Sequence, residues 1–487
     1  MQSTTSARLR ATPLVRLMGL AFAGTLAAAA LPAQADELGD LKAQIQALTQ
    51  RLGQLENQQK AASAAAAAPA APAKAAPRVT ALTTDQDGRP AKDDSAITLY
   101  SNGQSSLTIY GLIEATLSDV NHQDAAGHHA TGYQTAYFSG NRLGFDVQHA
   151  LGSAAPAALP DLKIIAKLEN EFEMATGWED TPGQLFNRDA WLGLYSKDLG
   201  KLTFGRQNTL TRDFTNTWGD PYGSAEVTTK EGGYSNVNNF KQFIYYSGSP
   251  SGTRMNSSVM WKKVFDEHLV VGAAYGFNSA GGGGSDNGGG SLPGDHVNGT
   301  SEAVSVAYNK INVGSVVLNV NGNYARGING HLLHQTLAFG GNVVAGPFRF
   351  NAGLVHYTAE QGVSNSLGKR TDNSWTTSIS YQPNAFEYDL GYQVMKGTNA
   401  GMKGGVILNA FADTSGATAT ADGSKRSLYG AVRYHFDKQA DIYFAADRFN
   451  VTGNWVVRDA QKNGAKFGAG QAFNSELEFA TGMRFKF

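Results

Sequence analysis

The chain closes on the stretch NSELEFATGMRFKF, residues 474–487, in which polarity alternates from one residue to the next. Leu477, Phe479, Met483, Phe485 and Phe487 share one phase of this alternation, and the residues of the other phase are charged or small. Successive side chains of a β-strand point to opposite faces. The stretch therefore predicts a strand with one face against an apolar environment and the other against water.

The same alternation extends back to residue 107 and predicts an antiparallel, all-β body. Brief connections such as 310–312, 383–385 and 437–439 alternate with long ones such as 278–300 and 396–426. This rhythm is typical of an outer-membrane barrel with short periplasmic turns and long external loops. The sixteen predicted strands are 107–117, 137–149, 162–173, 186–196, 199–206, 254–263, 268–277, 301–309, 313–325, 333–343, 348–358, 373–382, 386–395, 427–436, 440–449 and 475–487.

The two faces of the predicted strands indicate where the apolar side lies. In residues 428–436, Leu428, Val432 and Tyr434 oppose Arg433 and His435. Sixteen strands enclose a lumen that is too wide for side chains to fill, so we expect the apolar face to meet lipid and the charged face to meet water. A soluble β-sandwich also alternates in polarity, but its connections are more even in length and its strands are shorter, so it is the weaker alternative.

The first 35 residues predict a cleavable secretory signal. Arg8, Arg10 and Arg16 precede an apolar run at 17–31, and an Ala-x-Ala sequence ends at Ala35. The run is shorter than the roughly 20 residues that a membrane-spanning helix requires. We therefore expect export and cleavage after Ala35.

Residues 36–60 predict a short coiled-coil helix. Their apolar side chains recur at spacings of three and four, which is an a/d seam that buries itself against copies of the same helix. This seam consists of Leu38, Leu41, Ile45, Leu48, Leu52 and Leu55. It is shorter than a secure coiled coil and would depend on an oligomeric body to raise its effective concentration. The alternative is an amphipathic helix that lies on its own protein or on a membrane.

Residues 61–106 predict an Ala/Pro-rich and polar linker, and the composition of the whole chain limits its function. Cys is absent, which excludes thiolate chemistry, cysteine zinc sites and disulfides. Lys and Arg number 40 against 41 Asp and Glu, so the chain has no basic excess for nucleic acid. It also has no GxSxG, HExxH or P-loop sequence. We therefore expect no enzymatic activity, no catalytic residues, no cofactor and no metal site.

Several sequence words carry a family resemblance. They are SSLTIYGLIEATL (105–117), GNRLGFDVQHALG (140–152), LKIIAKLENEF (162–172), LFNRDAWLGL (185–194), KLTFGRQ (201–207) and the segment from RMNSSVMWKK to LVVGAAYGF (254–277). These words resemble the trimeric general-diffusion porins of Gram-negative bacteria, especially the β-proteobacterial type. The resemblance covers about residues 107–487. The ending with Phe485 and Phe487 also resembles the signal by which outer-membrane barrels are recognised for insertion.

The resemblance implies a 16-stranded β-barrel whose third external loop, here 207–253, folds inward and narrows the pore. In such porins, acidic residues on or near this loop face a basic ladder on the wall. Carried over to this sequence, the implied constriction residues are Arg142, Lys167, Glu169, Glu171, Arg188, Asp213, Asp220, Glu226, Glu231 and Arg254. The ladder position before Arg188 is Asn187 here, which weakens the ladder. Residues 239–249 of the loop are strand-like and predict an extra hairpin or a lid, or alternatively the sixth strand itself.

The resemblance also implies a homotrimer in the bacterial outer membrane, with one water-filled pore per copy for passive diffusion of ions and small hydrophilic solutes. Two other hypotheses stay open: a substrate-specific anion, carboxylate or phosphate channel, and a barrel-anchored adhesin or cell-wall tether. The expected partners are outer-membrane lipid, lipopolysaccharide and the barrel-assembly machinery. The N-terminal helix would lie in the periplasm and reach toward peptidoglycan or another periplasmic partner.

Overall fold

The computed structural model of the chain has two units, residues 1–71 and residues 72–487. In the first unit the structure describes Gln50 alone, which is helical and exposed. In the second unit it describes residues 95–134, 137–219, 253–266, 268–277, 299–329, 331–408, 414–458 and 466–487. The predicted signal, the predicted coiled-coil seam, the segment 239–249 and the acids Asp220, Glu226 and Glu231 lie outside the described residues.

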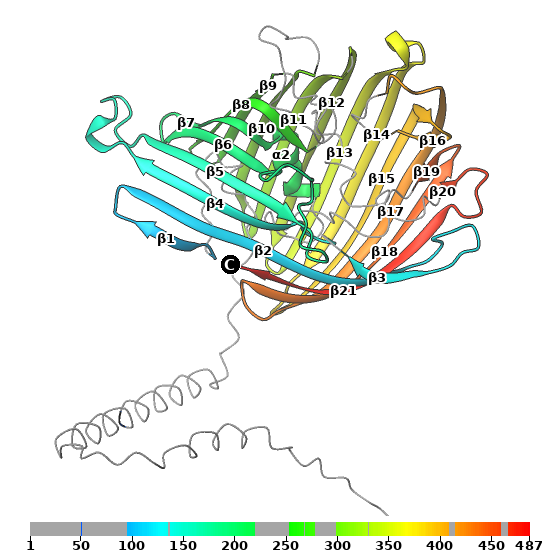
Figure 1. Cartoon of the computed structure of the whole chain (residues 1–487), viewed down its shortest axis with the longest axis horizontal. Helices are drawn as coiled ribbons and strands as arrows, with labels where there is room; N and C mark the ends of the chain where they lie inside the picture. The colour runs from blue at the N-terminus through cyan, green and yellow to red at the C-terminus, as the bar shows by residue number, and fades with distance from the viewer. Residues whose placement is uncertain are drawn as a thin grey trace, which may run out of the picture. The chain divides into compact units, whose positions relative to one another are not determined.

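Within the described residues, sixteen antiparallel strands form a closed barrel (Figure 1). Each strand pairs with the next along the chain, and the last strand pairs with the first. The barrel strands are β2 (Ser105–Val120), β4 (Asn141–Ala150), β5 (Lys163–Phe172), β6 (Asp189–Ser196), β7 (Gly200–Asn208), β8 (Arg254–Phe265), β9 (Leu269–Gly276), β10 (Ser301–Val313), β11 (Val316–Asn329), β12 (Leu332–Ala345), β13 (Phe348–Gln361), β14 (Gly368–Tyr381), β15 (Phe386–Lys403), β17 (Ala419–His435), β18 (Ala440–Gly453) and β21 (Ser475–Lys486). The predicted fold class and strand number are confirmed.

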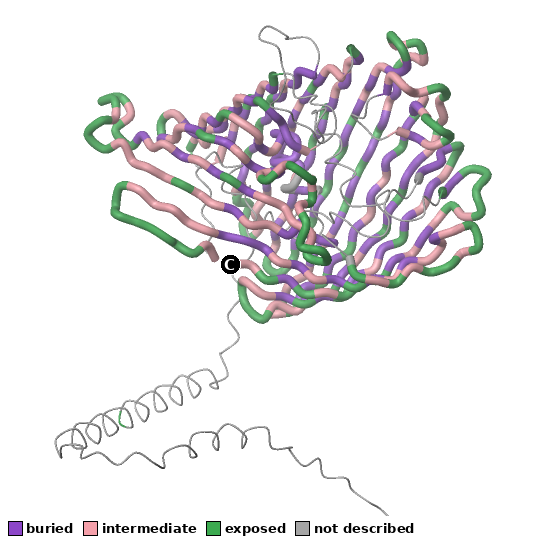
Figure 2. The backbone as a smooth tube through the Cα atoms, in the orientation of Figure 1, coloured by how far each residue is buried: buried purple, intermediate pink, exposed green. Residues whose placement is uncertain are grey.

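Buried and exposed residues alternate along the barrel strands (Figure 2). The polarity of the two faces is the reverse of that of a soluble protein. Leu354 and Phe339 on the outer face are 61% and 60% exposed, whereas Arg433 and Arg484 on the inner face are 0% and 1% exposed. An outward apolar face and an inward polar face are what a barrel in lipid requires. Among the described residues, no helix is both long enough and apolar enough to cross a membrane.

The end of the chain closes the barrel. Phe487 donates its backbone N–H to the Gly111 carbonyl at 3.1 Å and accepts a hydrogen bond from the Gly111 N–H at 2.8 Å. The Phe487 ring lies over Gly111, where a Cβ atom would collide with it. Closure leaves no unpaired barrel edge, which explains why the chain can end on a strand.

Several predicted boundaries are wrong; for example, β15 and β17 extend well into the predicted connection 396–426. Residues 310–312 are not a turn: β10 continues through them with a bulge at Lys310 (φ 57°), and the turn lies at Gly314 (φ 60°). Glycine adopts this left-handed backbone at no steric cost, which places the turn there. Residues 137–140 precede β4 and are not part of it.

The described start of the third external loop folds inward, as predicted. It begins with α2 (Leu210–Gly219), which packs inside the barrel against β10 to β13 (Figure 1). Leu210 lies against Gly272 at one end of the helix, and Trp218 lies against Gly340 and Gly353 at the other. Glycine at these three positions lets the helix approach the wall closely.

Shorter elements line the two rims. β1 (Ile97–Ser101) pairs with the start of β2, inside the region that the sequence predicts as linker. β3 (Ala130–Gln134) pairs with the outer half of β2, and β16 (Val406–Ile407) pairs with β15. The hairpin of β19 (Val456–Arg458) and β20 (Lys466–Gly468) contributes to a hydrophobic cluster on the inner wall that includes Trp455, Phe467 and Tyr357.

Candidate functional site

Four arginines form a row across the inner wall. Arg142 lies on β4, Arg188 immediately before β6, Arg206 on β7 and Arg254 at the start of β8. The strand register brings them to neighbouring positions: Arg142 is opposite Glu171, and Arg254 and Arg206 lie on paired strands two positions apart. The fold therefore collects charges from distant parts of the chain into one band, which we call the arginine row.

Three of these guanidinium groups are held by the main chain. Arg142 Nε donates to Gly140 O at 2.9 Å, and Arg206 Nε donates to Asn187 O at 2.8 Å. Arg254 Nε donates to Arg188 O at 2.8 Å. A carbonyl that accepts such a hydrogen bond fixes the orientation of the guanidinium. These contacts therefore hold the three guanidinium groups at defined positions on the wall.

The fourth arginine is neutralised by acids. Arg188 donates from Nε to Glu169 and from a terminal nitrogen to Glu171. The other Glu169 oxygen accepts a hydrogen bond from the Tyr110 hydroxyl at 2.7 Å and lies 4.0 Å from Lys167 Nζ. Buried charges persist only when paired in this way. Arg188 thus forms ion pairs with both Glu169 and Glu171 of β5.

The formal charges of this band sum to a positive value. The arginine row and Lys167 contribute five cations, and the nearby acids are Glu169, Glu171, Asp189 and Asp146, the last directly opposite Lys167. Five cations against four anions favour anions slightly at this level of the lumen.

The structure pairs Asp213 with Lys262, which is not part of the arginine row. Asp213 lies in the first turn of α2, where Asn208 donates to its Oδ1 at 2.8 Å and Lys262 Nζ on β8 contacts its Oδ2 at 2.9 Å. An acid in a first helical turn also interacts favourably with the helix dipole. In this position Asp213 fastens the start of α2 to the wall.

Sequence reasoning missed Arg206, Tyr110 and Lys262. Strict alternation from Lys201 and Thr203 would point Arg206 outward, but the register shifts between Gly205 and Gln207. Gly205 has a φ of 130°, and such a bulge turns the following side chain toward the lumen. No local sequence signal separates this glycine from others. Lys262, by contrast, shares the inward phase of Met260 and could have been found by alternation.

A second region of the inner wall, on β11 and β12, carries no charged Asp, Glu, Lys or Arg side chain among its described inward residues. Asn321 accepts a hydrogen bond from Trp218 Nε1 at 2.8 Å and donates to Phe214 O at 3.1 Å. Asn319 donates to Asn342 at 2.8 Å. This neutral wall binds α2 through amide groups and close packing.

A third region holds the residues after the first external loop. Glu114 accepts hydrogen bonds from the backbone N–H groups of Phe138 and Ser139, both at 2.8 Å, and from the Tyr443 hydroxyl at 2.7 Å. Tyr137 and Phe138 are fully buried beside Tyr443. Their apolar character indicated a strand, but it reflects burial against the inner wall.

A family model described as Gram-negative porin matches residues 61–454. An outer membrane porin protein of Bordetella pertussis is 26% identical over 164 residues, which are 31% of this chain and 41% of that protein. The chain therefore matches less than half the length of this relative.

Solved structures share the fold. An anion-selective porin from Comamonas acidovorans is 16% identical with a TM-score of 0.54, covering 79% of this chain and 100% of that one. The outer membrane protein OmpT of Vibrio cholerae is 17% identical with a TM-score of 0.50, covering 80% of this chain and 99% of that one. These likenesses support the barrel architecture.

Proposed function

The chain belongs to the Gram-negative porin family, and we propose that it forms a water-filled channel in the bacterial outer membrane for passive diffusion of ions and small hydrophilic solutes. The arginine row carries this proposal. It places fixed charges on one side of a lumen that α2 narrows from another side. Fixed charges at a constriction set ion preference while weak binding allows solutes to leave.

We expect a weak preference for anions, because cations outnumber acids in the band of the arginine row. One similar structure is described as an anion-selective porin, which is consistent with this expectation. Arg142, Lys167, Glu169, Glu171, Arg188 and Arg254 are the proposed constriction residues among those described, with Arg206 added. Asp213 is proposed to act through the position of α2.

A substrate-specific channel is the second candidate. Guanidinium groups held by carbonyls could together bind a carboxylate or phosphate, since arginine recognises both through paired N–H groups. Such a channel would show currents or fluxes that saturate with solute concentration.

We also propose a homotrimer. One of the similar OmpT structures is described as a trimer form. Residues 36–60 would then supply three copies of the predicted seam in the periplasm. If a deletion of residues 36–78 changed neither the thermal stability of the oligomer nor its cell-wall association, the role proposed for this segment would be wrong.

Planar-bilayer recording of the purified full chain tests the channel. We expect a linear current–voltage relation, and a reversal potential in a KCl gradient that moves toward cations in Arg142→Ala and Arg254→Ala. Absence of conductance would contradict the channel, and saturation with added phosphate or carboxylate would favour the substrate-specific candidate.

A further inference from the structure

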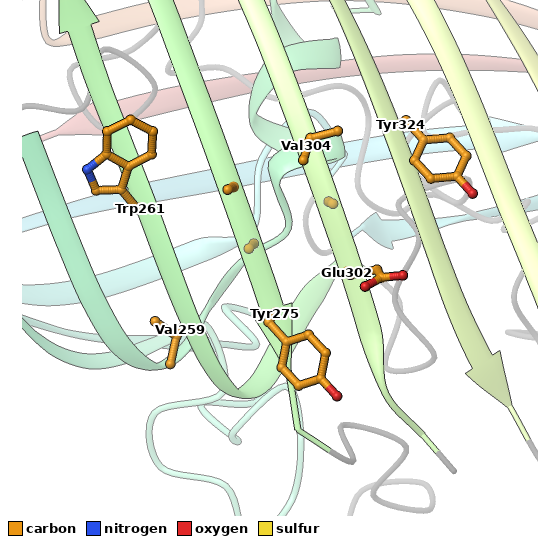
Figure 3. A pocket seen from close by; sticks show the side chains of 9 residues that line it. Val259, Trp261, Tyr275, Glu302, Val304 and Tyr324 are labelled. Carbon is orange, nitrogen blue, oxygen red and sulfur yellow. The ribbon is translucent and has the colours of Figure 1, made fainter. Parts of the chain in front are cut away.

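The outer face of the barrel has a depression of about 570 Å³ across β8 to β11 (Figure 3). Trp261, Tyr275 and Tyr324 contribute aromatic side chains to its lining. Glu302, the charged residue of the lining, lies 2.6 Å from Arg326 Nε, so the charge at this place is paired. The inner wall on β14 to β17 is different, because one of its buried charges has no such partner among the described residues.

That charge is Lys425, in the half of β17 nearer the external loops. Lys425 is only 4% exposed, and the strand register places it between Met395 on β15 and Val451 on β18. Both neighbours belong to the hydrophobic cluster of the inner wall. Among the described residues, no hydrogen bond or ion pair reaches the Lys425 ammonium group, and the charged groups that act on it are Arg370 and Asp372. Because lysine is almost never buried unless its charge is paired, this ammonium requires a counterion.

Asp372 does not meet this requirement, because Arg370 already matches its charge. Arg370 Nη2 lies 2.7 Å from Asp372 Oδ2, and Arg370 Nε donates to Asp372 Oδ1 at 2.9 Å. Arg370 Nη1 also donates to Leu408 O at 2.6 Å, and the guanidinium lies 5.8 Å from the ring centres of both Tyr357 and Trp455. Arg370, Lys425 and Asp372 together leave this part of the wall with one unmatched positive charge.

The surroundings of Lys425 along β17 are apolar on one side and polar on the other. Trp455 lies over Gly423 and Gly397, where a Cβ atom would collide with the indole, and Gly423 is the inward residue before Lys425. Ser427 is the inward residue after Lys425, and its buried hydroxyl has no hydrogen-bond partner in the described part of the chain. An ammonium and a hydroxyl two residues apart on one face of a strand can donate to the same anion.

We propose that Lys425 and Ser427 hold one chloride ion at the inner wall of β17. One unmatched positive charge calls for one monovalent anion. Phosphate and sulfate carry a second negative charge, for which the described residues of this part of the wall provide no second unmatched cation. A halide accepts hydrogen bonds from both donors and needs no room for an organic body, as a carboxylate solute does. The chloride site lies on β17 and is therefore distinct from the arginine row on β4 to β8.

The ion stabilises the part of the wall on which the β19–β20 hairpin packs. Trp455 and Phe467 are buried in the same hydrophobic cluster as Met395 and Val451, the two neighbours of Lys425. An uncompensated ammonium in such a place costs free energy, and a bound anion removes part of that cost. Chloride therefore stabilises the folded chain beyond its general effect on ionic strength, because it binds the folded state.

Anomalous diffraction from crystals of the full chain grown with bromide in place of chloride locates the ion. We expect a bromide peak at hydrogen-bonding distance from Lys425 Nζ and Ser427 Oγ. Lys425→Met removes the charge from an apolar place and should abolish the peak, and Ser427→Ala should weaken it. Lys369→Met is the matched control, because Lys369 is an exposed lysine on β14, and it should keep the peak. No peak at Lys425 in the unaltered chain, or the same peak in Lys425→Met, would overturn the proposal.

Thermal unfolding tests the same site in detergent solution. At constant ionic strength, exchange of methanesulfonate for chloride should raise the unfolding midpoint of the unaltered chain and of Lys369→Met. The midpoint of Lys425→Met should not respond. An equal response of Lys425→Met and Lys369→Met would overturn the proposal. Neither measurement uses conductance, so failure of the chloride site and failure of the proposed channel give different results.

Discussion

The charged wall on β4 to β8 and the neutral wall on β11 and β12 face the same lumen with different chemistry. The charged wall holds the arginine row and its acids. The neutral wall presents Asn319, Asn321 and Asn342 and receives α2. The helix α2, which narrows the pore, therefore packs mainly against the neutral wall. No charged side chain of that wall has to be desolvated to receive the helix.

This division has a physical reason. Covering a charged group with a helix costs the desolvation of that charge unless a partner is supplied, whereas an amide can be satisfied by one or two hydrogen bonds. The exception is the start of α2, where Lys262 on the charged wall has its partner in Asp213.

The largest expected effect comes from removing the centre of the charged wall. Arg188→Ala leaves Glu169 and Glu171 without their main cation, and breaking a buried pair in this way costs about 3–5 kcal/mol. We expect a lower thermal midpoint by calorimetry and a shift of ion preference toward cations. Arg188→Lys keeps the charge and should recover most of the ion preference. An unchanged midpoint for Arg188→Ala would mean that water already compensates the two acids.

A smaller effect is expected where Trp218 meets the wall. Gly353→Leu would place a side chain in the volume of the indole, and overpacking of this kind costs about 1–3 kcal/mol. The helix should lose its far contact, giving a larger and noisier single-channel conductance. Gly322→Ala is the control, because a Cβ there meets only ordinary contacts. The same noise in both variants would show that the docking of Trp218 does not fix the constriction.

A still smaller effect should follow the loss of one amide of the neutral wall. Asn321→Ala removes its hydrogen bonds with Trp218 and Phe214, each worth about 1 kcal/mol. Asn323→Ala is the matched control, since the Asn323 side chain has no hydrogen-bond partner among the described residues. The urea midpoints of the two variants, compared with that of the unaltered chain, measure the loss of stability in each. A larger loss of stability in Asn323→Ala than in Asn321→Ala would contradict the assigned role of Asn321.

Most of the barrel could be predicted from the sequence, because each strand has one face in lipid and one toward the lumen. That alternation gives sixteen strands and the closing role of residues 474–487. It fails where the register shifts, at Lys310 and at Gly205, since a bulge reverses the phase without a distinct sequence signal. It also fails at Tyr137 and Phe138, where apolar residues are buried inside the barrel.

The candidate site was predictable in part. Arg142 and the acids of β5 followed from alternation and from the family resemblance, but the pairing of Arg188 with both acids depends on strand register. The docking of Trp218 on two glycines joins residues more than a hundred positions apart. No local pattern contains that information.

The reversal potential in a KCl gradient tests most directly whether the charged wall sets ion preference. It should be compared between a triple variant, Arg142→Gln, Arg206→Gln and Arg254→Gln, and the neutral-wall variant Asn323→Ala. We expect a clear shift toward cations in the triple variant and the unaltered value in Asn323→Ala. An unaltered value in the triple variant, or the same shift in both, would mean that the charged wall does not set ion preference.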